Sequence, residues 1–182
     1  KQKNREKERR SLLKILSTQY RYFLNKIEED QELFEDAARL LCQALIGEGD
    51  VYIYGKEEMD AVVREALYGQ DRHEKIKRLV DDKPLHHADR ALLFVRSPSD
   101  EDAIALAKRL YERHVPFAVV TTKKADDHPL ESLSDVYIHL GVRGGIIPTE
   151  SGKRIGHLDT ALALYTYICI RCLIDDILSE YE

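Results

Sequence analysis

The pattern of apolar and polar positions between residues 88 and 122 predicts a strand, a helix and a second strand. Residues 91–95 form an unbroken apolar run, and residues 117–121 form a second one that ends in Thr121. Such runs are typical of strands that are buried on both faces. Between them, apolar residues recur at helical spacing, namely Ala103, Ile104, Ala107, Leu110 and Tyr111. A crossover of this length joins two parallel strands and lays its helix across one face of the sheet.

The same patterns predict the elements in the rest of the chain. They are helices over residues 6–29, 30–46 and 57–68, strands over 51–54, 76–80 and 136–140, a helical turn over 130–133 and a last helix over 157–180. Asp30 is placed to cap the second helix, and the glycine-rich residues 141–156 indicate an irregular loop. Residues 81–88 indicate a connector, and residues 123–129 a polar loop.

The order of these elements predicts an α/β fold. Alternating strands and helices give a three-layer α/β/α sandwich around a mostly parallel sheet of about five strands. We expect one domain over residues 1–182, with N-terminal helices over 1–46 and the α/β core over 50–182. The last helix is apolar nearly all round from residue 161 to 174, which predicts that it is buried in the core or in an interface.

Composition limits the kinds of partner that this chain can have. With 182 residues, 43% of them apolar, the chain has enough apolar surface for a core. A formal net charge of -5 argues against a nucleic-acid partner, and no apolar segment reaches the roughly 18 residues of a membrane span. The absence of a secretory signal pattern and the odd number of cysteines, three, favour a cytoplasmic location.

The cysteines and histidines do not predict a metal site or a cofactor. Cys169 and Cys172 have the spacing of a redox or metal motif, but they lie within the apolar helix, where cysteines behave as small hydrophobic residues. His86 and His87 are adjacent, so on a strand they would point to opposite faces.

Four segments of the chain resemble the sugar isomerase (SIS) domain family, in its phosphoheptose isomerase-like form. They are DVYIYG at 50–55, ADRALLFVRS at 88–97, VPFAVVTT at 115–122 and PLESLSDVYI at 129–138. The resemblance covers roughly residues 30–180. It implies a flavodoxin-like strand order, a phosphate-binding loop after the second of these segments, and sites at the interface of a dimer or tetramer.

Two loops depart from the pattern of that family. The first family loop reads Gly-x-Gly-x-Ser, whereas residues 55–59 read GKEEM. The phosphate loop reads Ser-x-Ser-Gly-x-Ser/Thr, whereas residues 95–100 read VRSPSD. Proline thus replaces a glycine and removes an N–H donor, and acidic residues stand where an anion would bind.

The candidate ligand-binding residues follow the carboxyl ends of the predicted strands, where open α/β sheets bind ligands. They are Gly55, Lys56, Arg96, Ser97, Ser99, Thr121 and Thr122. Hydroxyl groups and free N–H groups at a helix N-terminus hold phosphate, and Lys56 and Arg96 would add positive charge. Alternatively, Ser97 caps a helix whose first residue is Pro98, and the acids that follow complement the helix dipole.

The candidate catalytic residues are His157, Asp159 and Glu57, with Glu58 beside it. The resemblance implies a histidine or glutamate base near the last helix, and His157 and Asp159 occupy that place. Glu57 and Glu58 are carboxylates suited to proton transfer between sugar carbons. Alternatively, all four are ordinary residues of helix N-termini.

Three hypotheses about function follow. The chain is a diverged SIS-like protein that binds a phosphosugar without turnover, an aldose–ketose phosphosugar isomerase, or an oligomeric scaffold without a small ligand. The altered Gly55 loop favours the first over the second, and the retained Ser97, Ser99 and Thr121 favour it over the third. The apolar stripes of the first and last helices also predict a homodimer or homotetramer.

Overall fold

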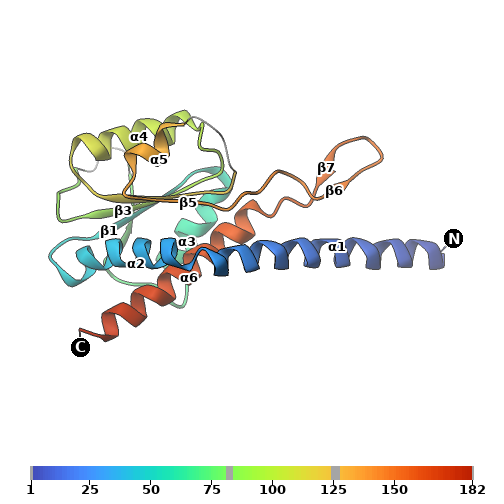
Figure 1. Cartoon of the computed structure of the whole chain (residues 1–182), viewed down its shortest axis with the longest axis horizontal. Coiled ribbons are helices and arrows are strands. Elements are labelled where there is room, and N and C mark those ends of the chain that lie inside the picture. The colour runs from blue at the N-terminus through green and yellow to red at the C-terminus, as the bar shows by residue number, and fades with distance from the viewer. Residues whose placement is uncertain (1, 81–83, 124–127, 182) are drawn as a thin grey trace.

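The computed structural model describes residues 2–80, 84–123 and 128–181 and contains a five-stranded sheet (Figure 1). The strands are β1 (Val51–Gly55), β2 (Ile76–Arg78), β3 (Arg90–Val95), β4 (Phe117–Thr121) and β5 (Val136–His139). Their order is β2-β1-β3-β4-β5, and every neighbouring pair is parallel. This is the flavodoxin-like order. The predicted α/β fold and its parallel sheet are therefore confirmed, and the strand predicted over residues 76–80 forms one edge of the sheet.

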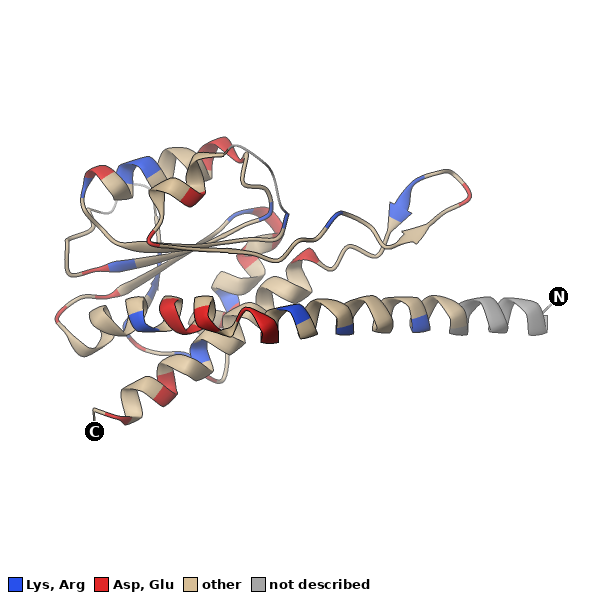
Figure 2. Ribbon diagram, viewed as in Figure 1, with Lys and Arg blue, Asp and Glu red and all other residues tan. Residues whose placement is uncertain are grey.

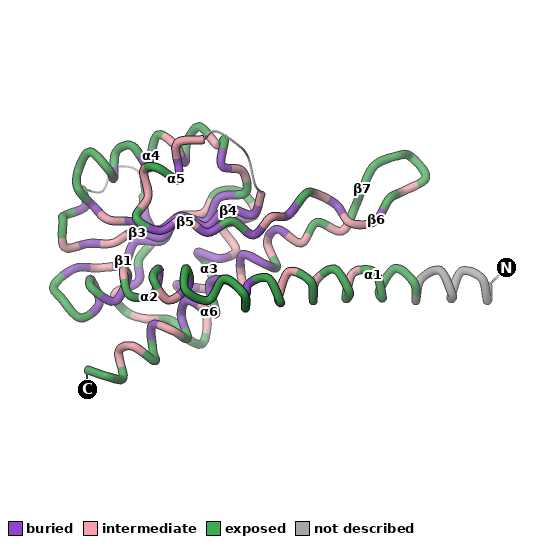
Figure 3. The backbone as a smooth tube through the Cα atoms, viewed as in Figure 1, coloured by how far each residue is buried: buried purple, intermediate pink, exposed green. Residues whose placement is uncertain are grey.

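Helices cover both faces of the sheet (Figure 1). One face packs against α2 (Gln31–Ile46), α3 (Asp60–Tyr68) and α6 (Asp159–Ser179), and the other against α4 (Glu101–Glu112) and α5 (Pro129–Leu133). Along β3, Leu92 and Phe94 join the first core, whereas Leu93 and Val95 join the second. Figure 3 shows β3 and β4 as buried over nearly all of their length, which is why their sequences are almost wholly apolar.

The helix α1 (Gln2–Glu29) extends well beyond the rest of the molecule (Figure 1). Its C-terminal part reaches the core through Ile27, which is buried. Towards its N-terminus the apolar side chains are exposed, among them Leu12, Leu13 and Ile15. Among the described helices, none combines the length and the apolar character that crossing a membrane requires.

Two local predictions were wrong, and the start of the last helix lies two residues from its predicted place. Residues 141–156 are not wholly irregular, because β6 (Ile147–Pro148) and β7 (Arg154–Ile155) form an antiparallel hairpin. Strands of two residues are too short to show an alternating pattern. The side chain of Asp30 makes no capping hydrogen bond to α2. The last helix begins at Asp159, so His157 precedes it.

Two further predicted segments are only partly described. The connector over residues 81–88 and the polar loop over residues 123–129 include positions 81–83 and 124–127, which lie outside the described residues. The predicted helix over 57–68 divides into a 3-10 turn, η1 (Glu57–Met59), and α3.

Candidate functional site

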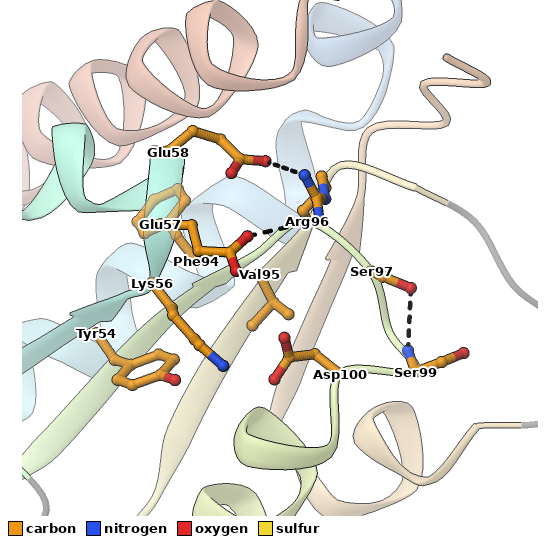
Figure 4. Close-up of a pocket in the computed structure, with 10 residues that line it drawn as sticks. All are labelled: Tyr54, Lys56, Glu57, Glu58, Phe94, Val95, Arg96, Ser97, Ser99 and Asp100. Atoms are coloured by element: carbon orange, nitrogen blue, oxygen red, sulfur yellow. Dashed lines mark hydrogen bonds and ion pairs between the residues drawn. The ribbon is translucent and has the colours of Figure 1, made fainter.

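The loops that follow β1 and β3 face each other across a cleft at the carboxyl edge of the sheet (Figure 4). The two strands are parallel neighbours, with Gly55 opposite Phe94, so both loops leave the sheet at the same edge. The cleft has a volume of about 100 Å³. Its lining residues are Tyr54, Lys56, Glu57, Glu58, Phe94, Val95, Arg96, Ser97, Ser99 and Asp100. Six of the candidate site residues are thus brought together here, namely Lys56, Glu57, Glu58, Arg96, Ser97 and Ser99.

Acidic side chains neutralise the two cations of the cleft. Arg96 Nη1 lies 2.9 Å from Glu58 Oε1, and Arg96 Nη2 lies 3.6 Å from Glu57 Oε2 (Figure 4). Lys56 forms an ion pair with Asp102 on the first turn of α4. The hydrogen bond between these two groups raises the pKa of the Lys56 ammonium and lowers the pKa of the Asp102 carboxyl. The cleft therefore carries its own anions beside its cations.

One residue of the first loop has a backbone conformation that favours glycine. Glu57 has a φ of 54°, in the left-handed region that glycine adopts without strain. This is the position of the second glycine in the SIS loop pattern. Gly55 is also constrained, because a Cβ at that position would lie 2.4 Å from the carbonyl oxygen of Met59.

The second loop holds its serines in a turn before α4. Ser99 N–H donates to Ser97 Oγ at 3.3 Å, and Asp100 N–H donates to the carbonyl oxygen of Ser97 at 3.1 Å. The cap of α4 is Asp100, whose carboxylate accepts a hydrogen bond from Ala103 N–H at 2.9 Å. The alternative in which Ser97 caps a helix starting at Pro98 is therefore wrong. Capping is done by an acid that lies in the cleft.

Thr121 lies outside the cleft. Its side chain is buried, and its hydroxyl is 2.9 Å from the Tyr137 hydroxyl. The Tyr137 hydroxyl in turn lies 3.1 Å from His128 Nε2. Burial raises the pKa of Tyr137. The Thr121 hydroxyl thus belongs to a polar chain within the protein.

Thr122 and Asp159 form a buried pair that ties the end of β4 to the start of α6. Thr122 Oγ1 lies 2.7 Å from Asp159 Oδ1 and 3.0 Å from the carbonyl oxygen of Arg96, and its single proton is shared between them. His157 is exposed, and its Nδ1 lies 3.9 Å from Asp159 Oδ2. None of Thr122, His157 and Asp159 lines the cleft.

Several residues of the site were not predicted from the sequence. Tyr54 and Phe94 form walls of the cleft, and Asp100 and Asp102 supply a helix cap and a lysine partner. The run of acids at residues 100–102 was the available signal, because Asp100 caps α4 and Asp102 reaches Lys56 after β1.

Among the described residues, no group of three or more His, Cys, Asp or Glu side chains is arranged to hold a metal ion. The cysteines Cys42, Cys169 and Cys172 are all free thiols. Burial raises the pKa of Cys42 to about 11, so this thiol is protonated near neutral pH.

Comparison with protein families assigns residues 12–178 to the family described as "Domain of unknown function (DUF2529)". The chain belongs to the DUF2529 family. This DUF2529 chain is 30% identical over 172 residues to "Uncharacterized protein YwjG" of Bacillus subtilis (strain 168), covering 93% of its own length and 99% of that relative.

The DUF2529 fold is similar to solved SIS-like structures. A phosphoheptose isomerase from Francisella tularensis superimposes with a TM-score of 0.67 at 13% identity, covering 91% of this chain and 98% of that one. The Vibrio vulnificus NanR protein complexed with ManNAc-6P superimposes with a TM-score of 0.66 at 17% identity, covering 93% of this chain and 63% of that one. At such identities the likeness shows the fold, which confirms the predicted three-layer SIS-like architecture.

Proposed function

We propose that this DUF2529 protein binds a phosphorylated carbohydrate in the cleft between the β1 and β3 loops and does not turn it over. The observation that carries the proposal is the convergence of Arg96, Ser97 and Ser99 with the Gly55 loop at one sheet edge. A cleft of about 100 Å³ suits a phosphate group, with the sugar extending outwards. Sites that enclose a whole small molecule typically measure about 300–1,000 Å³. The sugar would therefore lie mostly outside this smaller cleft and would bury little of its surface.

Phosphate binding requires Arg96 to exchange an acidic partner for the ligand. The Arg96 and Glu57 side chains are 49% and 62% exposed and 3.6 Å apart. An exposed pair of this kind contributes about 0–1 kcal/mol, so a phosphate dianion can displace Glu57 at small cost. Glu57 and Glu58 then act as internal competitors that set the affinity.

The positions of the candidate bases favour binding without catalysis. A general base must lie within hydrogen-bond reach of the proton that it removes. His157 and Asp159 stand apart from the cleft, and the Asp159 carboxylate accepts a hydrogen bond from Thr122. Glu57 and Glu58 lie in the cleft but face Arg96.

A panel of sugar phosphates and the corresponding free sugars tests the proposal by thermal shift and calorimetry. We expect the wild-type protein to be stabilised by at least one sugar phosphate and by no free sugar. Ser97→Ala weakens this binding, and Arg96→Ala removes it, whereas Ser132→Ala, at an exposed position of α5, has no effect.

Two outcomes would replace the proposal. Turnover of sedoheptulose 7-phosphate by the wild type, lost in His157→Ala, would show an isomerase. Absence of any shift with the whole panel would favour a scaffold without a small ligand.

We also propose that α1 pairs with α1 of a second copy in a homodimer, or in a homotetramer built from such dimers. Leu12 and Leu13 are 40% and 66% exposed in the single chain. Pairing of α1 with a second copy of α1 would cover these exposed apolar side chains. Sedimentation of the protein as a monomer only would exclude this assembly.

A further inference from the structure

A second groove lies between α1 and the chain that connects β5 to the β6–β7 hairpin. Its volume is about 1,120 Å³, roughly ten times that of the cleft. The lining residues are Ile15, Gln19, Tyr22, Phe23, Lys26, Lys123, His139, Gly141, Val142, Arg143, Gly144, Gly145, Ile146 and Arg154. The groove shares no lining residue with the cleft.

The charge around this groove is positive only. Lys26, Lys123, Arg143 and Arg154 line it, and among its described lining residues there is no aspartate or glutamate. The whole chain has 33 acidic and 28 basic side chains, so this composition is a local reversal of the net charge. Figure 2 shows the basic segments on α1, on the chain before β6 and on β7. A cleft lined by charges of one sign attracts ions of the opposite sign.

The four cations of the groove have no acidic partner among the described residues. Arg154 donates through Nε to the carbonyl oxygen of Gly145 at 2.7 Å and through Nη2 to that of Ile146 at 2.8 Å. These acceptors are neutral, so they fix the position of the guanidinium without pairing its charge. Lys26 Nζ lies 6.0 Å from the centre of the Tyr22 ring. In the described part of the chain, none of the four cations forms an ion pair with an acid, in contrast to Arg96 in the cleft.

The location and the walls of the groove fit a small organic molecule. Lys123 follows β4 and His139 ends β5, so the groove opens at the carboxyl edge of the sheet, where α/β folds bind ligands. Tyr22 and Phe23 provide an aromatic wall. The four cations come from α1, β7 and two loops, and they surround more space than one phosphate group fills. A ligand with a single phosphate would therefore leave most of these cations without an anionic partner.

From these observations we infer that the groove is a binding site for a small organic molecule that carries two or more phosphate groups. Its phosphates bind Arg143, Arg154, Lys26 and Lys123, and its carbon skeleton packs against the aromatic wall. This site is independent of the proposed function, because it uses different residues and takes a more highly charged ligand.

Calorimetry with fructose 1,6-bisphosphate and ADP tests this inference on the full-length assembled protein, with fructose and adenosine as uncharged controls. We expect at least one of the phosphorylated probes to bind, and its binding to weaken as ionic strength rises. Arg143→Glu and Lys26→Glu each weaken it about tenfold or more, because each removes a charge-assisted contact and adds repulsion. Lys108→Glu, an exposed charge reversal on α4, changes it by less than about twofold.

Other outcomes overturn the inference. They are an absence of binding by either probe at millimolar concentration, or equal affinity in wild type and Arg143→Glu. A loss of binding in Arg96→Ala with no loss in Arg143→Glu would assign the probe to the cleft instead. Binding of a DNA oligonucleotide that Arg143→Glu removes, with no binding of the small probes, would show a nucleic-acid surface.

Discussion

Replacing Glu57 by glycine separates the two roles of this residue, which are a strained backbone and an acid that competes for Arg96. The φ of 54° at Glu57 costs a residue with a Cβ about 1–2 kcal/mol. Glycine relieves this strain, but it also makes the unfolded chain more flexible, which lowers the free energy of unfolding by about 0.4–1 kcal/mol. Alanine removes the same carboxylate and keeps the strain. Glu57→Gly is therefore expected to be more stable than Glu57→Ala by about 0.8 kcal/mol, the difference between the midpoints of these two estimates.

Urea unfolding and thermal melting measure this difference directly. For a chain of this length, about 1 kcal/mol corresponds to a change in melting temperature of roughly 2–4 °C. His114 also has a positive φ, 55°, and it lies at the end of α4, away from the cleft. His114→Gly is therefore the matched control, which should exceed His114→Ala in stability without altering ligand binding.

The ligand readout of the same variants tests the second role. Glu57→Gly and Glu57→Ala both remove one of the two acids beside Arg96, so both should bind a sugar phosphate more tightly than the wild type does. The reasoning is refuted if the glycine variant is no more stable than the alanine variant. Weaker sugar phosphate binding in both variants would show instead that Glu57 contacts the ligand.

Three further predictions concern the assembly, the core and the response to pH. Leu13→Glu should shift the sedimentation coefficient towards that of a monomer, whereas Lys14→Glu, one position along α1, should not. Thr122→Val should lower the free energy of unfolding in urea by about 1–3 kcal/mol, since the buried Asp159 carboxylate loses its donor; an unchanged midpoint would contradict this. Burial raises the pKa of Cys42 from 9.0 to about 11, so its contribution to stability is complete below pH 9.0 and is lost as pH rises towards about 11. Cys42→Ala should flatten the curve of stability against pH between pH 9.0 and about 11. An equal slope in wild type and variant over this range would show that Cys42 is not the group responsible.

The candidate site was predictable in position but not in chemistry. The apolar runs that end at Gly55 and Val95 placed two polar loops at the ends of strands, and parallel pairing brought those ends together. The sequence also offered Arg96 and Ser97 as anion ligands. It did not show that Arg96 is paired with Glu57 and Glu58, because such pairing depends on how two loops some forty residues apart are oriented.

Loops were predicted less well than strands and helices. The β6–β7 hairpin has strands of two residues, and a pattern with a period of two needs more residues to be recognised. One of the two alternatives for Ser97 made it the cap of α4, because proline often follows a cap, yet Asp100 takes this role and Ser97 closes a turn.

The sequence alone determined the layers, the parallel sheet and the order in which elements follow one another. A strand that is buried on both faces needs an unbroken apolar run, and a helix that packs on one face needs an apolar stripe. Both patterns involve residues that are close together in the chain, so they can be recognised in the sequence. Tertiary structure alone decided the Thr122–Asp159 pair, the neutralised cations of the cleft and the cationic groove between α1 and the β5–β6 connection. Each of these depends on side chains that are distant in sequence, and their separation in space is set only when the whole core has packed.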